Sequence, residues 1–85
     1  MERFVYKIRD KEGIHARPAG IVVKKAKEFE SDISIENKGK KVNAKGIFAV
    51  MSLAAKYGEE IVITIEGSDE KFALAEMKKV LEENI

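Results

Sequence analysis

The sequence contains no cysteine, no tryptophan, one proline and one histidine among its 85 residues. Without cysteine the chain cannot form disulfides, thiolate nucleophiles or cysteine-based zinc sites. A single histidine cannot build a histidine-rich metal centre, so we expect neither a metal nor a cofactor. At this length a hydrophobic core is only just sufficient. Packing and ion pairs must therefore supply the stability that a disulfide or a metal would otherwise add.

Long apolar runs and a strong charge imbalance are also missing. No stretch approaches the roughly 20 apolar residues needed to span a bilayer, and the opening residues Met1 to Phe4 show no signal-peptide pattern. We therefore expect a cytoplasmic protein with no segment inserted in a membrane. The 16 Lys and Arg residues nearly balance the 15 Asp and Glu residues, which leaves a formal net charge of +1. That balance does not favour a nucleic-acid partner.

The spacing of apolar residues predicts strands and helices that share one domain, residues 1–85. Period-two alternation predicts four strands, at about 2–9, 31–37, 40–44 and 61–65. Helical spacing predicts three helices, at about 16–28, 46–55 and 69–82. Strands with one apolar and one polar face predict an α+β fold with one antiparallel sheet covered by helices on a single face. The right-handed crossover of the first strand–helix–strand unit leaves room for the last strand between the first two.

Turn and cap residues predict where several elements end. Asn37-Lys38-Gly39 predicts a hairpin turn, since Gly39 can adopt a positive φ. Gly58 is the expected left-handed end of the second helix. Ser68 is the expected N-cap of the last helix.

The segment 46–55 is apolar on nearly every side, which is typical of a helix that is buried all round. A domain with one sheet and one helical layer cannot easily bury it completely, so we expect one stripe to face the core and the other to be partly exposed. The core stripe consists of Val50, Leu53 and Ala54. The partly exposed stripe consists of Ile47, Phe48 and Met51. Such a cluster favours a docking surface, with a helix sandwiched in the core as an equally weighted alternative.

The only histidine and the only proline lie in one hexapeptide, Gly13 to Pro18. His15 falls at or next to the start of the first helix, where Ser, Thr, Asp and Asn are the preferred caps. Free N–H groups and a partial positive charge at a helix start form an anion site. The helix dipole contributes only about 0.3–1 kcal/mol, whereas amide hydrogen bonds and Arg17 could stabilise a phosphate on the ring several times more. This arrangement favours a reversible phosphoryl carrier.

Two other interpretations of His15 remain. A lone histidine beside an arginine is most often an ordinary surface residue. A hydrolase is less favoured, because no second general base or nucleophile accompanies His15, and Ser31 and Ser52 carry no catalytic motif. A neighbouring helix face, which carries Arg17, Gly20, Ile21, Lys24 and Lys27, is basic with a small gap at Gly20. The coincidence of the histidine, this basic face and the apolar stripe favours the carrier.

The residues Gly13 to Ala19, Gly-Ile-His-Ala-Arg-Pro-Ala, closely resemble the active-site motif of the HPr family, the histidine-containing phosphocarriers of the bacterial sugar phosphotransferase system. The resemblance continues through Lys41 to Lys45, Val50 to Leu53 and Glu66 to Glu70, and it covers essentially the whole chain. It implies an open-faced β-sandwich, with four antiparallel strands in the order 1-4-2-3 and three helices on one face.

The resemblance also implies a function. Enzyme I, phosphorylated by phosphoenolpyruvate, would transfer its phosphoryl group to Nδ1 of His15, and the chain would pass it to sugar-specific enzyme IIA components. The chain would be a covalent intermediate in a relay and not an enzyme. Arg17 would assist transfer, and the backbone of Ala16 and Arg17 would stabilise the phosphoryl group. The implied docking residues are Gly20, Lys24, Lys27, Ile47, Phe48 and Met51. We expect a monomer.

One position departs from the pattern of many Gram-positive family members. They carry a regulatory serine just before the second helix, where this chain has Gly46. Control by a serine kinase, and the catabolite-repression role that depends on it, should therefore be absent. A regulatory phosphocarrier of a nitrogen-related branch is the first alternative function. A binding module that has lost phosphoryl transfer is the second, although it would not need the pair His15 and Arg17.

Overall fold

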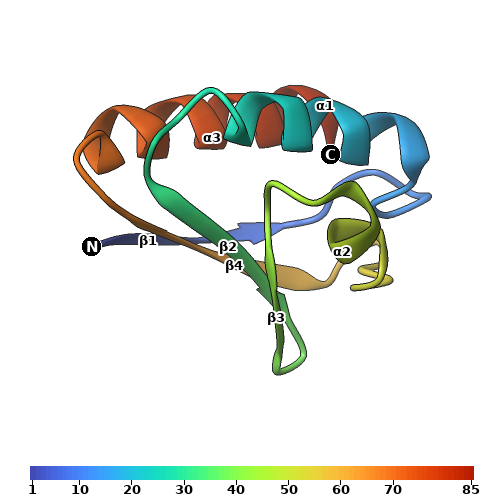
Figure 1. Cartoon of the computed structure of the whole chain (residues 1–85). Coiled ribbons are helices and arrows are strands. Elements are labelled where there is room, and N and C mark those ends of the chain that lie inside the picture. The colour runs from blue at the N-terminus through green and yellow to red at the C-terminus, as the bar shows by residue number, and fades with distance from the viewer.

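The computed structural model describes all 85 residues and has the predicted order of elements (Figure 1). The strands are β1 (Glu2–Lys7), β2 (Asp32–Asn37), β3 (Lys40–Asn43) and β4 (Glu60–Glu66). The helices are α1 (Ala16–Ala26), α2 (Ile47–Met51) and α3 (Glu70–Asn84). None of the three helices combines the length and apolar character that crossing a membrane requires.

The strands form one antiparallel sheet in the order β1-β4-β2-β3, which confirms the predicted order. β4 pairs with β1 on one side and β2 on the other, so that Ile63 lies opposite both Phe4 and Ile35. α1 and α3 lie side by side over one face of the sheet, with α2 near the N-terminal half of α1 (Figure 1). The β2–β3 turn contains Lys38 and Gly39, both with positive φ, as the hairpin prediction requires for the glycine.

The hydrophobic core lies between the sheet and its helical cover. Each fully buried isoleucine contributes about 1.5–3 kcal/mol relative to an exposed one, so the central strand β4 is a main source of stability. Its three isoleucines, Ile61, Ile63 and Ile65, are completely buried. Apolar residues at helical spacing on α1, with Phe29 beyond its end, are all buried: Ala19, Val22, Val23, Ala26 and Phe29. On α3, Ala73, Met77, Val80 and Leu81 are buried in the same way, and Leu74 is partly buried.

The second helix is shorter than predicted. α2 ends at Met51, and Ala54, with a φ of 50°, takes a left-handed conformation soon after it. Gly58 is also left-handed, with a φ of 83°, but it lies beyond the helix and does not end it. Val50 and Leu53 face the core as predicted, but Ala54 is exposed and Ala55 is buried in its place. Burial of two residues only two positions apart, Leu53 and Ala55, does not fit helical spacing. The chain therefore leaves the helix before Ala55 reaches the core.

A polar network fixes the segment that follows α2. The buried side chain of Asn37 donates hydrogen bonds to the carbonyl oxygen of Leu53 at 3.3 Å and to Oε1 of Glu59 at 3.4 Å. Glu59 also pairs with Lys38 and accepts a hydrogen bond from the N–H of Lys56. The Lys38 ammonium, together with the Lys56 N–H, lowers the pKa of Glu59 to about 2. The end of β2 and the start of β4 thus hold this segment from both sides.

The start of α3 also differs from its prediction. Its N-cap is Asp69 and not Ser68, and the Asp69 carboxylate makes no capping hydrogen bond to the helix. It accepts hydrogen bonds from the Ser31 hydroxyl and from the N–H groups of Glu30 and Ser31. A carboxylate can satisfy three donors where a hydroxyl cannot. Asp69 therefore joins the connection between α1 and β2 to the start of α3.

The loop between β1 and α1 passes very close to the segment after α2. Gly13 has a φ of 71°, and a Cβ at this position would lie 2.3 Å from the carbonyl oxygen of Ala55. The same oxygen accepts a hydrogen bond from the N–H of Ile14 at 3.0 Å. Both the backbone conformation and the available space therefore require glycine at position 13.

Replacement of Gly13 by alanine should destabilise the protein. The added methyl group would collide with the Ala55 oxygen, and a left-handed conformation costs a residue with a Cβ about 1–2 kcal/mol. We expect the free energy of unfolding, measured by urea denaturation, to fall by at least that amount. Gly39→Ala is the control. Gly39 has a similar φ of 83°, but a Cβ added there would meet no atom within 4 Å. Equal losses for both variants would show that the close approach to Ala55 is not important.

The carboxylate of Asp69 should make stability depend on pH. Its hydrogen bond from the Ser31 hydroxyl, followed by those from the backbone, lowers the pKa of Asp69. A group with a lowered folded pKa stabilises the fold above its unfolded pKa of about 3.9, and this contribution is lost as the pH falls below that value. Asp69→Asn should therefore have a lower urea midpoint than the unmodified protein at pH 7. The difference between the two midpoints should narrow as the pH is lowered toward 3, and a constant difference would contradict this assignment.

Candidate functional site

Two backbone anchors hold the hexapeptide Gly13–Pro18 in place. On one side, the N–H of Asp10 donates to the carbonyl oxygen of Ile85 at 2.7 Å, which ties the loop to the end of α3. On the other side, the N–H of Ile14 donates to the carbonyl oxygen of Ala55, beyond α2. The loop therefore reaches α1 from a point fixed by both neighbouring helices.

His15 occupies the predicted position at the start of α1. It is the N-cap residue, with an extended backbone (φ −112°, ψ −178°), and its imidazole makes no capping hydrogen bond. Its carbonyl oxygen accepts the N–H of Ala19 at 2.9 Å and so closes the first turn. The side chain is 38 % exposed. The ring is therefore accessible to a reactant and is not occupied by a structural role in the helix.

The first turn of α1 offers donors with no acceptor in the chain. The N–H groups of Ala16 and Arg17 make no hydrogen bond to any protein atom, and Pro18 has no N–H. The guanidinium of Arg17 also forms no ion pair or hydrogen bond within the chain, and its side chain is exposed. Two backbone donors and one cation next to His15 constitute a site suited to an anion.

One ring nitrogen of His15 lies near a carboxylate. Nε2 of His15 lies 3.5 Å from Oδ2 of Asp10, a residue that no sequence pattern singled out. A shallow hollow of about 130 Å³ surrounds this pair. Its lining residues are Asp10, His15, Arg17, Pro18, Ile21 and Asn84. Asn84 was also missed, because only the packing of α3 against α1 brings the end of the chain to this place.

One group of side chains has the types that a cation could use. Ligand atoms of Asp10, Glu12 and His15 all lie within 4.8 Å of one another. All three residues are at the surface, and exposed carboxylates commonly gather without an ion. The expectation that the chain binds no metal stays a prediction.

The predicted docking residues lie on two elements that touch. A Cβ at Gly20 of α1 would lie 3.6 Å from Cδ1 of Ile47, so α2 packs against α1 at this glycine and fills the expected gap. Phe48 is 84 % exposed and Met51 is 38 % exposed, as predicted for the outward stripe of α2. Lys24 and Lys27 are exposed on α1. The basic residues of α1 and the apolar residues of α2 therefore belong to adjoining elements, as the sequence predicted.

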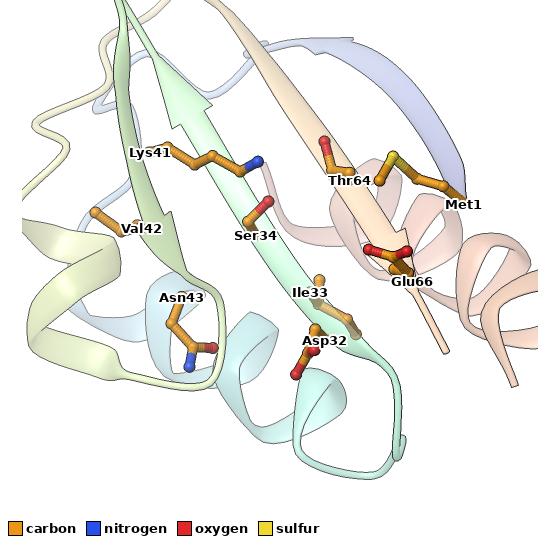
Figure 2. A pocket seen from close by; sticks show the side chains of 9 residues that line it. All are labelled: Met1, Asp32, Ile33, Ser34, Lys41, Val42, Asn43, Thr64 and Glu66. Carbon is orange, nitrogen blue, oxygen red and sulfur yellow. The ribbon is translucent and has the colours of Figure 1, made fainter. Parts of the chain in front are cut away.

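A larger hollow than the one beside His15 lies elsewhere, on the sheet (Figure 2). It has a volume of about 370 Å³ and is lined by residues of β2, β3 and β4 together with Met1. The side chains of Ser34, Lys41 and Thr64 lie in it (Figure 2). None of its lining residues belongs to the hexapeptide or to the predicted docking residues.

Comparison with known proteins gives one consistent result. The family described as "PTS HPr component phosphorylation site" matches residues 3–83. The HPr-like protein Crh of Bacillus subtilis is 42 % identical over 78 residues, which is 92 % of each chain. The solved histidine-containing phosphocarrier protein of a Mycoplasma is 39 % identical with a TM-score of 0.94, over 96 % of this chain and 93 % of the other.

A structure of an HPr dimer from Thermoanaerobacter tengcongensis is also similar, with 38 % identity and a TM-score of 0.77 over 98 % of this chain and 95 % of the other. The match over nearly the whole length, together with the four-stranded open sheet and its three helices, leads to one conclusion. The chain belongs to the HPr family of phosphocarrier proteins of the phosphotransferase system.

Proposed function

We propose that this chain is a general phosphocarrier of the phosphoenolpyruvate-dependent sugar phosphotransferase system. His15 accepts a phosphoryl group on Nδ1 from enzyme I and passes it to enzyme IIA components of sugar transporters. The observation that carries the proposal is the start of α1, where an accessible imidazole lies beside two N–H groups without acceptors. The chain is then a covalent intermediate, and both partners supply the catalysis of transfer.

Electrostatics favours the phosphorylated state at this position. Hydrogen bonds to a charged group contribute about 1.5–3 kcal/mol each, compared with about 0.3–1 kcal/mol for the helix dipole at an exposed site. The N–H groups of Ala16 and Arg17 and the free guanidinium of Arg17 are the donors available for a phosphoryl dianion. Because these donors act on the phosphoryl group and not on the free ring, they stabilise the product more than they activate the nucleophile.

Recognition by partners is assigned to the joined surfaces of α1 and α2. Phe48 and Met51 present apolar area, and the partly buried Ile47 lies against Gly20. Lys24 and Lys27, about one and two helical turns beyond Gly20, add exposed positive charge on the adjoining α1 side. An exposed aromatic anchor inside a charged rim is typical of protein interfaces. We assign the transferring form to a cytoplasmic monomer, since one chain contains both His15 and this surface.

A regulatory role is the second candidate, favoured by the similarity to Crh, which is described as a catabolite repression HPr. At the N-cap of α2, where many Gram-positive relatives carry a regulatory serine, this chain has Gly46. Gly46 offers no hydroxyl group to a kinase, which counts against serine-dependent control. A phosphocarrier of a nitrogen-related branch would share the chemistry of His15 and differ only in its acceptor.

Phosphorylation of His15 is the first test of the proposal. Incubation with enzyme I and phosphoenolpyruvate should add one acid-labile phosphoryl group, detected by mass spectrometry of the intact protein. His15→Ala should gain none. The labelled protein is then offered to enzyme IIA proteins of sugar and nitrogen branches, and the acceptor distinguishes the two functions. If the unmodified chain gains no phosphoryl group under conditions that label a known HPr, the proposed function is wrong.

Phe48→Ala tests the docking surface. The loss of an exposed aromatic anchor should weaken binding to enzyme I by about tenfold or more, measured by titration calorimetry. The free energy of unfolding should change by less than about 0.5 kcal/mol, as for other surface positions.

Phe72→Ala is the matched control, because Phe72 is also exposed but lies on α3. Its ring packs edge-on against Phe29 at 5.7 Å, so this variant should lose about 0.5–1.5 kcal/mol of stability without weaker binding. If Phe48→Ala lowers stability as much as it weakens binding, the ring of Phe48 belongs to the core and the docking assignment fails.

A further inference from the structure

We infer that Asp10 is a positioning residue that keeps the proton of the His15 ring on Nε2 and leaves the lone pair of Nδ1 free for phosphoryl transfer. The inference deepens the proposed function and rests on it. Its structural basis is the 3.5 Å approach of Asp10 Oδ2 to Nε2, on the side of the ring that takes no part in transfer.

Asp10 is held by three hydrogen bonds that leave one carboxylate oxygen free. Its N–H donates to Ile85 at 2.7 Å, and its carbonyl oxygen accepts from the N–H of Gly13 at 2.9 Å. Its Oδ1 accepts from the N–H of Glu12 at 2.8 Å. The orientation of the carboxyl group is therefore set by the loop itself. Oδ2 is the oxygen that remains, and it is the one that faces His15.

No other cation competes for this carboxylate. No Lys or Arg side chain pairs with Asp10, and His15 is its one basic neighbour among the paired groups. The adjacent Arg9 is directed away, with hydrogen bonds to the Tyr6 hydroxyl and the carbonyl oxygen of Glu82. Three charged groups thus lie around the ring. Asp10 is 3.5 Å from Nε2, and the Glu12 carboxylate has an oxygen within 4.8 Å of the ring and of the Asp10 carboxylate. Arg17 lines the same hollow.

The surroundings of the two ring nitrogens favour one tautomer. A neutral imidazole carries one N–H, and its location is set by the groups that face each nitrogen. The Asp10 carboxylate can only accept a hydrogen bond, which favours the proton on Nε2. The unpaired N–H groups at the start of α1 can only donate, so they provide no acceptor for a proton on Nδ1. Both effects leave Nδ1 as the nucleophile.

With the proton on Nε2, the bonds formed and broken balance in both steps of the relay. In acceptance, the lone pair of Nδ1 forms the N–P bond while the bond between phosphorus and the donor atom of phosphorylated enzyme I breaks, and the electron pair of that bond returns to the donor atom. The proton stays on Nε2 throughout. In donation, an acceptor nitrogen attacks phosphorus, the Nδ1–P bond breaks, and its electron pair stays on Nδ1. Since Nε2 is protonated, the leaving group is a neutral imidazole and not an imidazolide anion, which makes departure easier.

Asp10→Asn gives a sharp test. The asparagine oxygen can still accept from the Glu12 N–H, but the amide NH₂ would then face Nε2 as a donor and favour the opposite tautomer. Long-range ¹H–¹⁵N spectra of the His15 ring, recorded at a pH where its ¹⁵N shifts have reached a plateau, measure the tautomer ratio. We expect the ratio of the Nε2–H to the Nδ1–H form to fall by about twofold to fivefold, the range that corresponds to a partly exposed electrostatic contact.

Two further variants distinguish loss of the Asp10–His15 contact from a general loss of negative charge and from a disturbed fold. Glu12→Gln removes the same charge nearby without removing the 3.5 Å contact, and it should change the ratio much less. Asp10→Ser, whose hydroxyl can accept from the Glu12 N–H, should also lower the ratio, and it serves if thermal unfolding shows that the asparagine disturbs the fold. An unchanged ratio in the Asp10 variants, or an equal change in Glu12→Gln, overturns the inference.

The kinetics of phosphoryl transfer test whether the tautomer of His15 affects the reaction. With phosphorylated enzyme I as donor, Asp10→Asn should lower kcat by a factor similar to the change in the ratio, while KM stays the same because Asp10 lies outside the docking residues. An altered ratio with an unchanged kcat would overturn the role in transfer. The spectra need no phosphorylation, so failure of the unmodified chain to accept phosphate would reject the proposed function while leaving the tautomer measurement intact.

Discussion

The contact between Gly13–Ile14 and the carbonyl oxygen of Ala55 is the constraint on which the site depends. That oxygen accepts the N–H of Ile14 and lies so close to Gly13 that no side chain fits between them. The contact joins the loop that carries His15 to the segment that follows α2. As a result, the position of the histidine and the position of the outward face of α2 are fixed by the same backbone atoms. A partner that docked on α2, as proposed, would therefore meet the imidazole at a defined place, although no single helix carries both.

The fold could be predicted almost completely from sequence, because its strands alternate cleanly and its crossover follows a chirality rule. The crossover rule placed the last strand between the first two, and the pairing of β4 with both β1 and β2 confirmed it. Prediction failed where one residue serves two elements. Ala55 must reach the core and also receive the hexapeptide, so α2 ends at Met51 with Ala54 in a left-handed conformation. Helical spacing carries no information about a contact with residues 40 positions away.

Only part of the candidate site could be predicted from the sequence. His15 and Arg17 were recognisable because the histidine is unique and precedes a helix that begins with a proline in its first turn. Asp10 was not, since an Asp in a run of polar residues is indistinguishable from an ordinary loop residue. Its position follows from hydrogen bonds to Ile85 and Glu12 and from packing at the end of α3. Those are tertiary contacts, and no local sequence pattern predicts them.

In the proposed relay, the two sides of the imidazole have opposite electrostatic demands. The Nδ1 side must stabilise a dianion, for which free N–H groups and Arg17 are suitable, while the Nε2 side must keep a proton, for which a carboxylate is suitable. Neither influence can be too strong in a carrier that also gives up its phosphoryl group. The ring is 38 % exposed and the Asp10 side chain 29 % exposed, so solvent screens both. A deeper site would hold the phosphoryl group more tightly and release it more slowly, which explains why a carrier of this kind has its histidine at the surface.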